Sequence, residues 1–229
     1  MERLRQILAE DRKKLAGKRP SDILWYVWTY YRVQLGLIIG ILGLGIYLLF
    51  LQLTVPGTVG FYACFANTFK DYGPGSALYR EYAEYAELDL KKTRLIFNCS
   101  IYCNPSRNMM GNRYYEALIT LIDSGSLDVV IMSKEDLCAL GANGRLLDLS
   151  SEKAGGLAEA WQDRLCTTVP ADPEYGTSPI PVGIDLTGSR IVGDYEAYAG
   201  DAWLGISSES TRVDQAALFL RFLFSMPHP

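Results

Sequence analysis

Hydroxyl, amide and carboxyl side chains follow several of the segments that the sequence predicts to be strands. Asn98 and Ser100 come after one apolar run, Ser133 after another, and Asp185 and Thr187 after a third. In a parallel α/β sheet, ligands bind beyond the carboxyl ends of the strands. With Ser133 at a helix start, these five residues are candidates to bind a carboxylate or another polar solute. The alternative is that they only cap helices and fill turns.

Machinery for catalysis is missing from the sequence. The single histidine, His228, is second from the end, which excludes Ser-His-Asp and Cys-His arrangements. The Asp-Thr-Gly pair of aspartic proteases is not present, because the similar stretch 185–189 has no second copy to share a proton. Neither glycine-rich phosphate loop occurs, and no Cys/His cluster has zinc spacing. We therefore expect a non-enzymatic protein with no metal and no cofactor.

Composition predicts a folded chain whose charge is divided unevenly. The chain has 229 residues, of which 49% are hydrophobic and 21% charged, and this excludes an intrinsically disordered protein. Residues 1–32 hold eight Lys/Arg against four Asp/Glu, a net charge of +4, and the remaining residues carry −8. An acidic main body argues against nucleic acid as a partner, because phosphates need a basic surface.

Residues 33–55 form an uncharged apolar stretch of 23 residues. As a helix this stretch measures about 34 Å, enough to cross a hydrocarbon core of about 30 Å. The aromatic residues just before it are typical of a membrane interface: Trp25, Tyr26, Trp28, Tyr30 and Tyr31. A cleaved signal peptide is the alternative, but the apolar run is too long and no A-x-A-like site follows.

We therefore predict a signal anchor in a single-pass protein of the cell membrane. Residues 1–32 are a cytoplasmic basic segment with an interfacial aromatic stretch, 33–55 a transmembrane helix, and 56–229 an extracytoplasmic domain. The basic excess before the helix puts the N-terminus in the cytoplasm. Within the basic segment, residues 1–19 are predicted to form an amphipathic helix on the inner leaflet.

Three glycines, Gly36, Gly40 and Gly43, share one face of the predicted spanning helix. Small residues at this spacing let a second helix approach closely, although glycine is also common in spanning helices that do not dimerise. The expected partners are thus the lipid bilayer and either other membrane proteins or a second copy of the chain through this helix.

The five cysteines all follow the predicted anchor, where disulfides are permitted. They are Cys64, Cys99, Cys103, Cys138 and Cys166. A bridge from Cys64 to Cys99 would join neighbouring strands, whereas Cys99 to Cys103 would close a tight loop. An odd count leaves at least one thiol free or intermolecular. The alternative is that most are small buried hydrophobic side chains.

The outer body alternates strand and helix patterns. Strands are predicted at 59–65, 94–99, 127–132, 181–185 and 202–206, and helices at 76–92, 114–122, after Ser133, at 157–165 and at 211–224. Ser133 with Asp136, and Thr211 with Asp214, are predicted helix-capping pairs. This order predicts a single α/β domain with a mostly parallel sheet.

Three stretches together resemble the extracytoplasmic solute-binding proteins of bacterial ABC transporters. They are 79–98, 127–150 and 205–224, which follow the order of that family. Only about 35 residues, 150–184, separate the first-lobe passage from the returning strand, too few for a second lobe. The resemblance therefore implies one lobe of a periplasmic-binding-protein fold on a membrane anchor.

The function that this resemblance implies is binding. We expect a non-enzymatic accessory subunit that binds a ligand or a protein outside the cell. The alternative is a protein-interaction scaffold in a cell-envelope or secretion assembly, with no small-molecule ligand.

Overall fold

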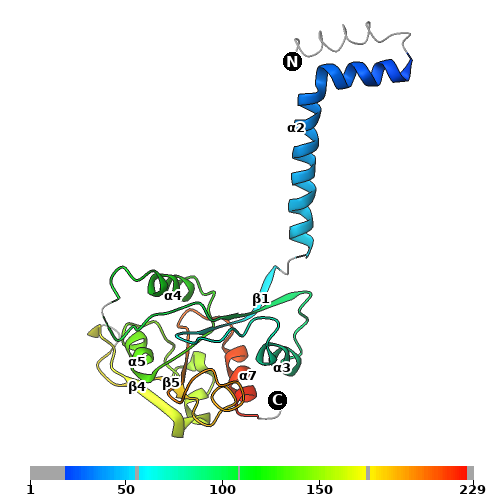
Figure 1. Ribbon diagram of the computed structural model, residues 1–229. Helices are drawn as coiled ribbons and strands as arrows, with labels where there is room; N and C mark the ends of the chain where they lie inside the picture. Colours follow the sequence, from blue (N-terminus) through cyan, green and yellow to red (C-terminus); the bar gives the residue numbers. More distant parts are fainter. Residues whose placement is uncertain (1–18, 55–56, 108, 174–175, 226–229) are drawn as a thin grey trace. The chain divides into compact units, whose positions relative to one another are not determined.

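Figure 1 shows a computed structural model of the chain, which describes residues 19–54, 57–107, 109–173 and 176–225. Contacts between residues divide the chain into two compact units, Met1–Val55 and Pro56–Pro229. The second unit holds the sheet and its covering helices.

The first unit contains one long helix, α2 (Pro20–Thr54). Pro20 stands at its first position, where the missing N–H of proline is tolerated. Within the part of the chain that the structure describes, no helix combines the length and apolarity needed to cross a membrane. The predicted transmembrane helix over 33–55 is therefore not confirmed. The predicted amphipathic helix over 1–19 lies, except for Arg19, outside the described residues.

The described part of the second unit forms a sheet of six strands in the order β2-β1-β3-β6-β5-β4. Their bounds are β1 (Thr58–Phe65), β2 (Thr93–Asn98), β3 (Val129–Met132), β4 (Leu165–Thr168), β5 (Ile180–Asp185) and β6 (Trp203–Ile206). β1 is parallel to β2 and β3, whereas β6 is antiparallel to β3 and β5, and β4 is antiparallel to β5. The prediction of a mostly parallel sheet is therefore wrong for the second half, although a single mixed α/β domain is confirmed.

Helices cover both faces of this sheet. The helices of the second unit are α3 (Ala77–Tyr85), α4 (Arg113–Asp123), α5 (Lys134–Ala142), α6 (Leu157–Ala160) and α7 (Val213–Leu223), with short 3-10 turns at Glu152–Ala154 and Gln162–Arg164. α3 and α7 pack on one face of the sheet, and α4 and α5 on the other. Because side chains alternate along a strand, β1 sends Phe61 to the first layer and Cys64 to the second.

Several predicted elements are confirmed and a few are wrong at their ends. Ser133 caps α5 as predicted, because its hydroxyl oxygen accepts the Asp136 N–H at 3.3 Å. The predicted Thr211 cap is wrong: α7 starts after Arg212, without a side-chain cap. The helix predicted to reach residue 92 ends at Tyr85, because the chain turns at Glu87, whose φ is 49°. The helix predicted over 157–165 is only the single turn α6, followed by a 3-10 turn and β4.

A buried carboxylate, Asp128, fixes the start of β3 against its neighbours. Its Oδ2 accepts the Tyr62 N–H at 2.8 Å and the Arg212 Nε–H at 2.9 Å, and its Oδ1 accepts the Ser210 hydroxyl at 2.7 Å. The Asp128 side chain is 0% exposed and that of Arg212 is 24% exposed. A buried charge is stable only when it is paired and hydrogen-bonded, so these contacts join β1, β3 and the loop before α7.

Candidate functional site

The strand directions bring several loops to one edge of the sheet. The parallel strands β1, β2 and β3 end at this edge. Since β6 is antiparallel to β3, it begins at this edge, and since β5 is antiparallel to β6, it ends there too. After β1 the chain crosses to α3 on one face, and after β3 it crosses to α5 on the other. This is a topological switch point, where open α/β sheets form their ligand crevices.

A cavity of about 260 Å³ lies at this switch point. We call it the edge crevice. It is lined by the segments next to four strands: Ala66 and Asn67 after β1; Asn104, Ser106 and Arg107 after β2; Ser133 after β3 with Glu135 and Asp136 in the first turn of α5; Tyr198 and Asp201 before β6.

The buried Asp136 carboxylate holds one wall of the edge crevice together. Its Oδ1 accepts both the backbone N–H and the hydroxyl of Ser106, at 3.1 and 2.7 Å. Its Oδ2 accepts the Ser133 hydroxyl at 2.7 Å. These bonds use the polar atoms of Ser133 and Asp136 inside the protein, so the two residues position the wall rather than offering free groups to a ligand.

The floor of the crevice is fixed by Tyr198 and Asn67. The Tyr198 hydroxyl lies 2.9 Å from the carbonyl oxygens of both Ala66 and Ile131, and burial raises the pKa of this phenol well above its ordinary value. Asn67, with a φ of 59°, donates from Nδ2 to the Cys103 carbonyl at 2.7 Å and accepts the Cys103 N–H at 3.0 Å. The crevice is therefore preformed and rigid at its base.

Three charged side chains at the crevice are exposed: Arg107, Glu135 and Asp201. No ion pair joins any of them to another residue that the structure describes. The Asp201 carboxylate accepts the Lys134 N–H at 3.3 Å, so a carboxylate already occupies the N-terminus of α5. A second anion at that helix end is thereby disfavoured, and the crevice offers one cation and two carboxylates to a ligand.

Among the five predicted ligand residues, the structure places only Ser133 at the edge crevice. Asn98 donates from Nδ2 to the Tyr62 hydroxyl at 3.0 Å, and its Oδ1 accepts the Ser100 N–H at 2.9 Å. Their tight turn lies beyond the end of β2.

Asp185 and Thr187 form a similar turn beyond β5. The Asp185 carboxylate accepts the Thr187 N–H at 2.8 Å and its hydroxyl at 2.7 Å. β6 lies between β3 and β5, so this turn is two strands away from Ser133. The five residues share one edge of the sheet but do not converge on one site.

The sequence interpretation misses Arg107, Asp201 and Tyr198. The sequence pattern predicts a loop after the strand at 94–99, and Arg107 lies in that loop. Its place at the carboxyl edge of the sheet could therefore have been predicted. Asp201 and Tyr198 precede β6, and a parallel β6 would put that loop at the opposite edge. Only the antiparallel pairing brings them to the crevice.

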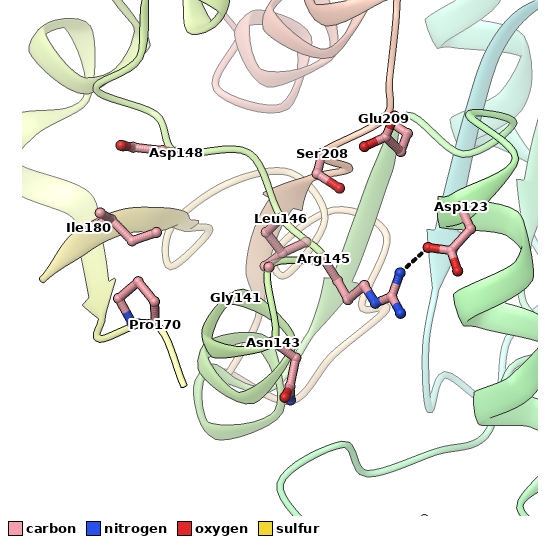
Figure 2. A pocket seen from close by; sticks show the side chains of 11 residues that line it. Asp123, Gly141, Asn143, Arg145, Leu146, Asp148, Pro170, Ile180, Ser208 and Glu209 are labelled. Carbon is pink, nitrogen blue, oxygen red and sulfur yellow. Dashed lines mark hydrogen bonds and ion pairs between the residues drawn. The ribbon is translucent and has the colours of Figure 1, made fainter. Parts of the chain in front are cut away.

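A larger cavity, of about 510 Å³, lies at the opposite edge of the sheet (Figure 2). Figure 2 shows Arg145 directed at Asp123, with which it forms an ion pair, while Glu209 and Ser208 lie on the neighbouring loop. The Asp148 carboxylate accepts the N–H and hydroxyl of Ser150 in a local turn. Because its cation is already neutralised by an acid, this cavity offers less to a charged ligand than the edge crevice.

The cysteines and the glycines of α2 complete the set of predicted sites. All five cysteines are free thiols in this structure, so the bridges expected among Cys64, Cys99 and Cys103 stay predictions. Burial raises the pKa of Cys103 to about 11 and that of Cys64 further. A Cβ at Gly36, Gly40 or Gly43 would meet nothing within 4 Å, so this face of α2 is open and helix dimerisation stays a prediction.

No metal cluster is formed by the His, Cys, Asp and Glu side chains that the structure describes. Comparisons with protein-family models, with curated proteins and with solved structures found no match to this chain. The resemblance to solute-binding proteins therefore stays a prediction.

Proposed function

We propose that this protein is a single-pass membrane protein whose extracytoplasmic α/β domain binds a small zwitterionic solute, without catalysis, as an accessory subunit of a membrane complex. The observation that carries the proposal is the edge crevice at a topological switch point, with two exposed carboxylates and with Arg107, which forms no ion pair with any described residue. The predicted likeness to one lobe of a solute-binding protein agrees with a binding role.

The membrane anchor in this proposal is the apolar part of α2. Every residue from 36 to 50 is exposed, and apolar residues such as Leu42, Ile46 and Phe50 are more than half exposed. Apolar side chains on all sides of a helix favour a lipid environment. The aromatic residues before them are typical of a membrane interface, and the basic excess on the same side supports an N-terminus in the cytoplasm.

This topology is tested with a membrane-impermeant maleimide on intact cells. Lys91→Cys places a thiol at an exposed position of the second unit, and the unchanged protein serves as the background for the native cysteines. Labelling of the variant above background is expected. Labelling that requires cell lysis would contradict the extracytoplasmic placement.

The ligand chemistry follows from the charges at the crevice. The Arg107 guanidinium can donate two parallel hydrogen bonds to a carboxylate, while Glu135 and Asp201 can accept from an ammonium group. A solute that carries both groups, such as an amino acid, satisfies both sets. A solute with a carboxylate alone brings a second negative charge next to the carboxylates of the crevice.

Calorimetry on the full-length protein in mild detergent tests this proposal, with a panel of free amino acids, their N-acetyl derivatives and their decarboxylated amines. At least one free amino acid is expected to bind at least tenfold more tightly than either derivative, since a hydrogen bond to a charged group contributes about 1.5–3 kcal/mol. Arg107→Gln should remove the preference for the free amino acid over the decarboxylated amine. The double variant with Asp201→Asn and Glu135→Gln should remove the preference for the free amino acid over its N-acetyl derivative.

Arg94→Gln is the matched control, because Arg94 is an exposed residue near the start of β2, away from the carboxyl edge. It should bind as the unchanged protein does. An equal loss of affinity in the Arg94 and Arg107 variants, or no binding across the panel, would remove the edge crevice as a solute site.

A protein-interaction scaffold is the second candidate function. Phe69, in the loop after β1, is 95% exposed, and its ring lies 6.2 Å from that of the partly exposed Tyr102. Aromatic side chains are enriched in protein interfaces, so this exposed pair favours a protein contact at the loop after β1. Pull-down in mild detergent with an anchor-swapped control tests this function: a membrane partner lost with Phe69→Ser but kept with Arg107→Gln would favour the scaffold.

A further inference from the structure

Two cysteines that the predicted bridges leave out face each other between α5 and β4. The Cys138 thiol points from α5 toward β4, with its Sγ 3.9 Å from the Thr167 carbonyl oxygen. The Thr168 hydroxyl donates to the Cys138 carbonyl at 3.1 Å, and this hydrogen bond joins α5 to β4 next to the Cys138 thiol. Cys166 belongs to the apolar layer against which Cys138 packs, and the neighbouring Cys138 thiol adds to the rise in the pKa of the Cys166 thiol that burial causes.

The surroundings make room for this pair. A Cβ at residue 183 of the neighbouring β5 would lie 2.8 Å from the Cys166 Sγ, so Gly183 leaves the space that the sulfur fills. Cys166 is 2% exposed, whereas Cys138 is partly exposed. A reagent from solution can therefore reach Cys138, while Cys166 is reached through Cys138.

We propose that Cys138 and Cys166 are the disulfide pair of this domain, formed by a thiol–disulfide oxidoreductase outside the cytoplasm. The inference rests on the proposed extracytoplasmic placement, because disulfides persist in oxidising compartments. It replaces the bridges predicted among Cys64, Cys99 and Cys103, and leaves those three cysteines as thiols.

The reaction is a thiol–disulfide exchange in two steps. The Cys138 thiolate attacks a disulfide sulfur of the oxidant, forming a mixed disulfide and releasing the first thiolate of the oxidant. Cys166 then loses its proton and attacks the Cys138 sulfur, which forms the internal bond and releases the second thiolate. Two electrons and two protons pass from the cysteine pair to the oxidant.

The order of these steps follows from burial. Burial raises the pKa of the Cys166 thiol to about 12, with a further rise from Cys138, while the Lys134 ammonium opposes the rise. Cys166 is therefore a poor first nucleophile. Once Cys138 carries the mixed disulfide, its sulfur is already next to Cys166, so the second step needs little movement.

The bond would act on an edge of the sheet. β4 is the last strand of the described sheet and pairs with β5 on one side, with an irregular register between Cys166 and Thr167. A bond from Cys138 to Cys166 closes a loop of 27 intervening residues. By constraining the unfolded chain, it should raise the melting temperature by about 5–10 °C.

The test uses the full-length protein in mild detergent, equilibrated with oxidised glutathione or with dithiothreitol, then alkylated and digested with trypsin. Cleavage places Cys138 in peptide 135–145, Cys166 in 165–190, and both Cys99 and Cys103 in 95–107. Mass spectrometry can thus identify each linkage. We expect 135–145 joined to 165–190 only after oxidation, with a melting temperature about 5–10 °C above that of the reduced protein.

Variants separate the pair from the other thiols. Cys138→Ser and Cys166→Ser should each abolish both the linked peptide and the temperature difference, whereas Cys99→Ser should keep both. Unlinked peptides in the oxidised wild type, or a temperature difference that Cys99→Ser removes, would overturn the proposed pair.

Alkylation of intact cells before lysis separates the failure of this inference from that of the proposed function. The linked peptide in cells is the expected result. A link that forms with glutathione but is absent in cells contradicts the extracytoplasmic placement and with it the proposed function. If the link is absent both with glutathione and in cells, the proposed Cys138–Cys166 pair is wrong. The extracytoplasmic placement is then tested by the maleimide labelling of Lys91→Cys alone.

Discussion

Replacing Asp128 by alanine should destabilise the sheet domain more than any substitution of a surface ion pair. The Asp128 carboxylate is fully buried and accepts three hydrogen bonds, from the Tyr62 backbone, the Ser210 hydroxyl and the Arg212 guanidinium. In Asp128→Ala the Tyr62 N–H and the Ser210 hydroxyl lose their buried acceptor. The Arg212 side chain loses its counter-charge at the same time.

The magnitude follows from the exposure of each partner. Breaking a buried ion pair by removing one member costs about 3–5 kcal/mol. Arg212 is 24% exposed and still donates to the Ser126 carbonyl at 2.9 Å, so water can recover part of its interaction. We therefore expect Asp128→Ala to lower the free energy of unfolding by about 3 kcal/mol, near the bottom of that range. For a unit of this size, the melting temperature should fall by about 6–12 °C.

Circular dichroism melts and urea titrations of the full-length protein in detergent measure the effect. The control is Lys70→Ala, which breaks the exposed pair of Lys70 with Glu196, 49% and 76% exposed, and should cost less than about 1 kcal/mol. In a double-mutant cycle, Asp128→Ala and Arg212→Ala together should cost less than the sum of the two single changes. A loss for Asp128→Ala no larger than for Lys70→Ala would refute the reasoning that this buried carboxylate fixes β3.

Three further changes test the packing around the sheet. Tyr198→Phe removes a buried hydroxyl from two backbone carbonyls and should cost about 1–2 kcal/mol in the same melts; a neutral result would mean that the floor of the edge crevice is hydrated. Gly183→Ala overlaps a side chain of α5 and should cost at least about 1–3 kcal/mol, whereas Gly75→Ala, with no atom within 4 Å of the new Cβ, should be near neutral. The Arg190 guanidinium lowers the pKa of the Glu81 carboxyl below 4.5. The stabilisation by this pair is therefore complete above pH 4.5 and is lost as the pH falls through the lowered pKa. Between pH 6 and pH 2.5 the melting temperature should fall less in Glu81→Gln than in the unchanged protein, and the corresponding difference in free energy of unfolding should be less than about 1 kcal/mol, because the Glu81 carboxylate is exposed.

Elements with a strong local pattern could be predicted from the sequence. The run at 127–132 predicts a strand covered on both faces, and all four residues of β3 are buried. Ser133 and Asp136 predict the start of α5, because a helix cap is a contact between residues three apart. In both cases the deciding interactions lie within a few residues of one another.

The direction of strands could not be predicted, because it is decided by pairings between distant residues. Val129 pairs with Ile206, and an antiparallel partner of β3 has the same apolar composition as a parallel one. β4 was missed for a related reason. Its single buried residue, Cys166, gives no alternation over four residues, and the strand exists through its pairing with β5.

The candidate site depends on these same distant pairings. The rule that polar residues gather at carboxyl ends of parallel strands correctly selects Ser133 at the edge crevice. It also selects Asp185, which lies at the same edge but two strands away, because β6 is inserted between β3 and β5. Asp201 lies at the crevice because β6 is antiparallel to β3 and therefore begins at the edge where β3 ends.

The position of β1 determines how the domain would carry a mechanical load. β1 begins at Thr58, immediately after the unit that holds α2, and its far end leads into Asn67 at the edge crevice. A pulling force between the unit that holds α2 and anything bound at the edge crevice would run along β1. Its hydrogen bonds to β2 and β3, which pair with it over 58–64 and 63–65, lie across that direction. They would be loaded together in shear instead of opening one at a time, so the domain should unfold slowly when it is pulled from the start of β1.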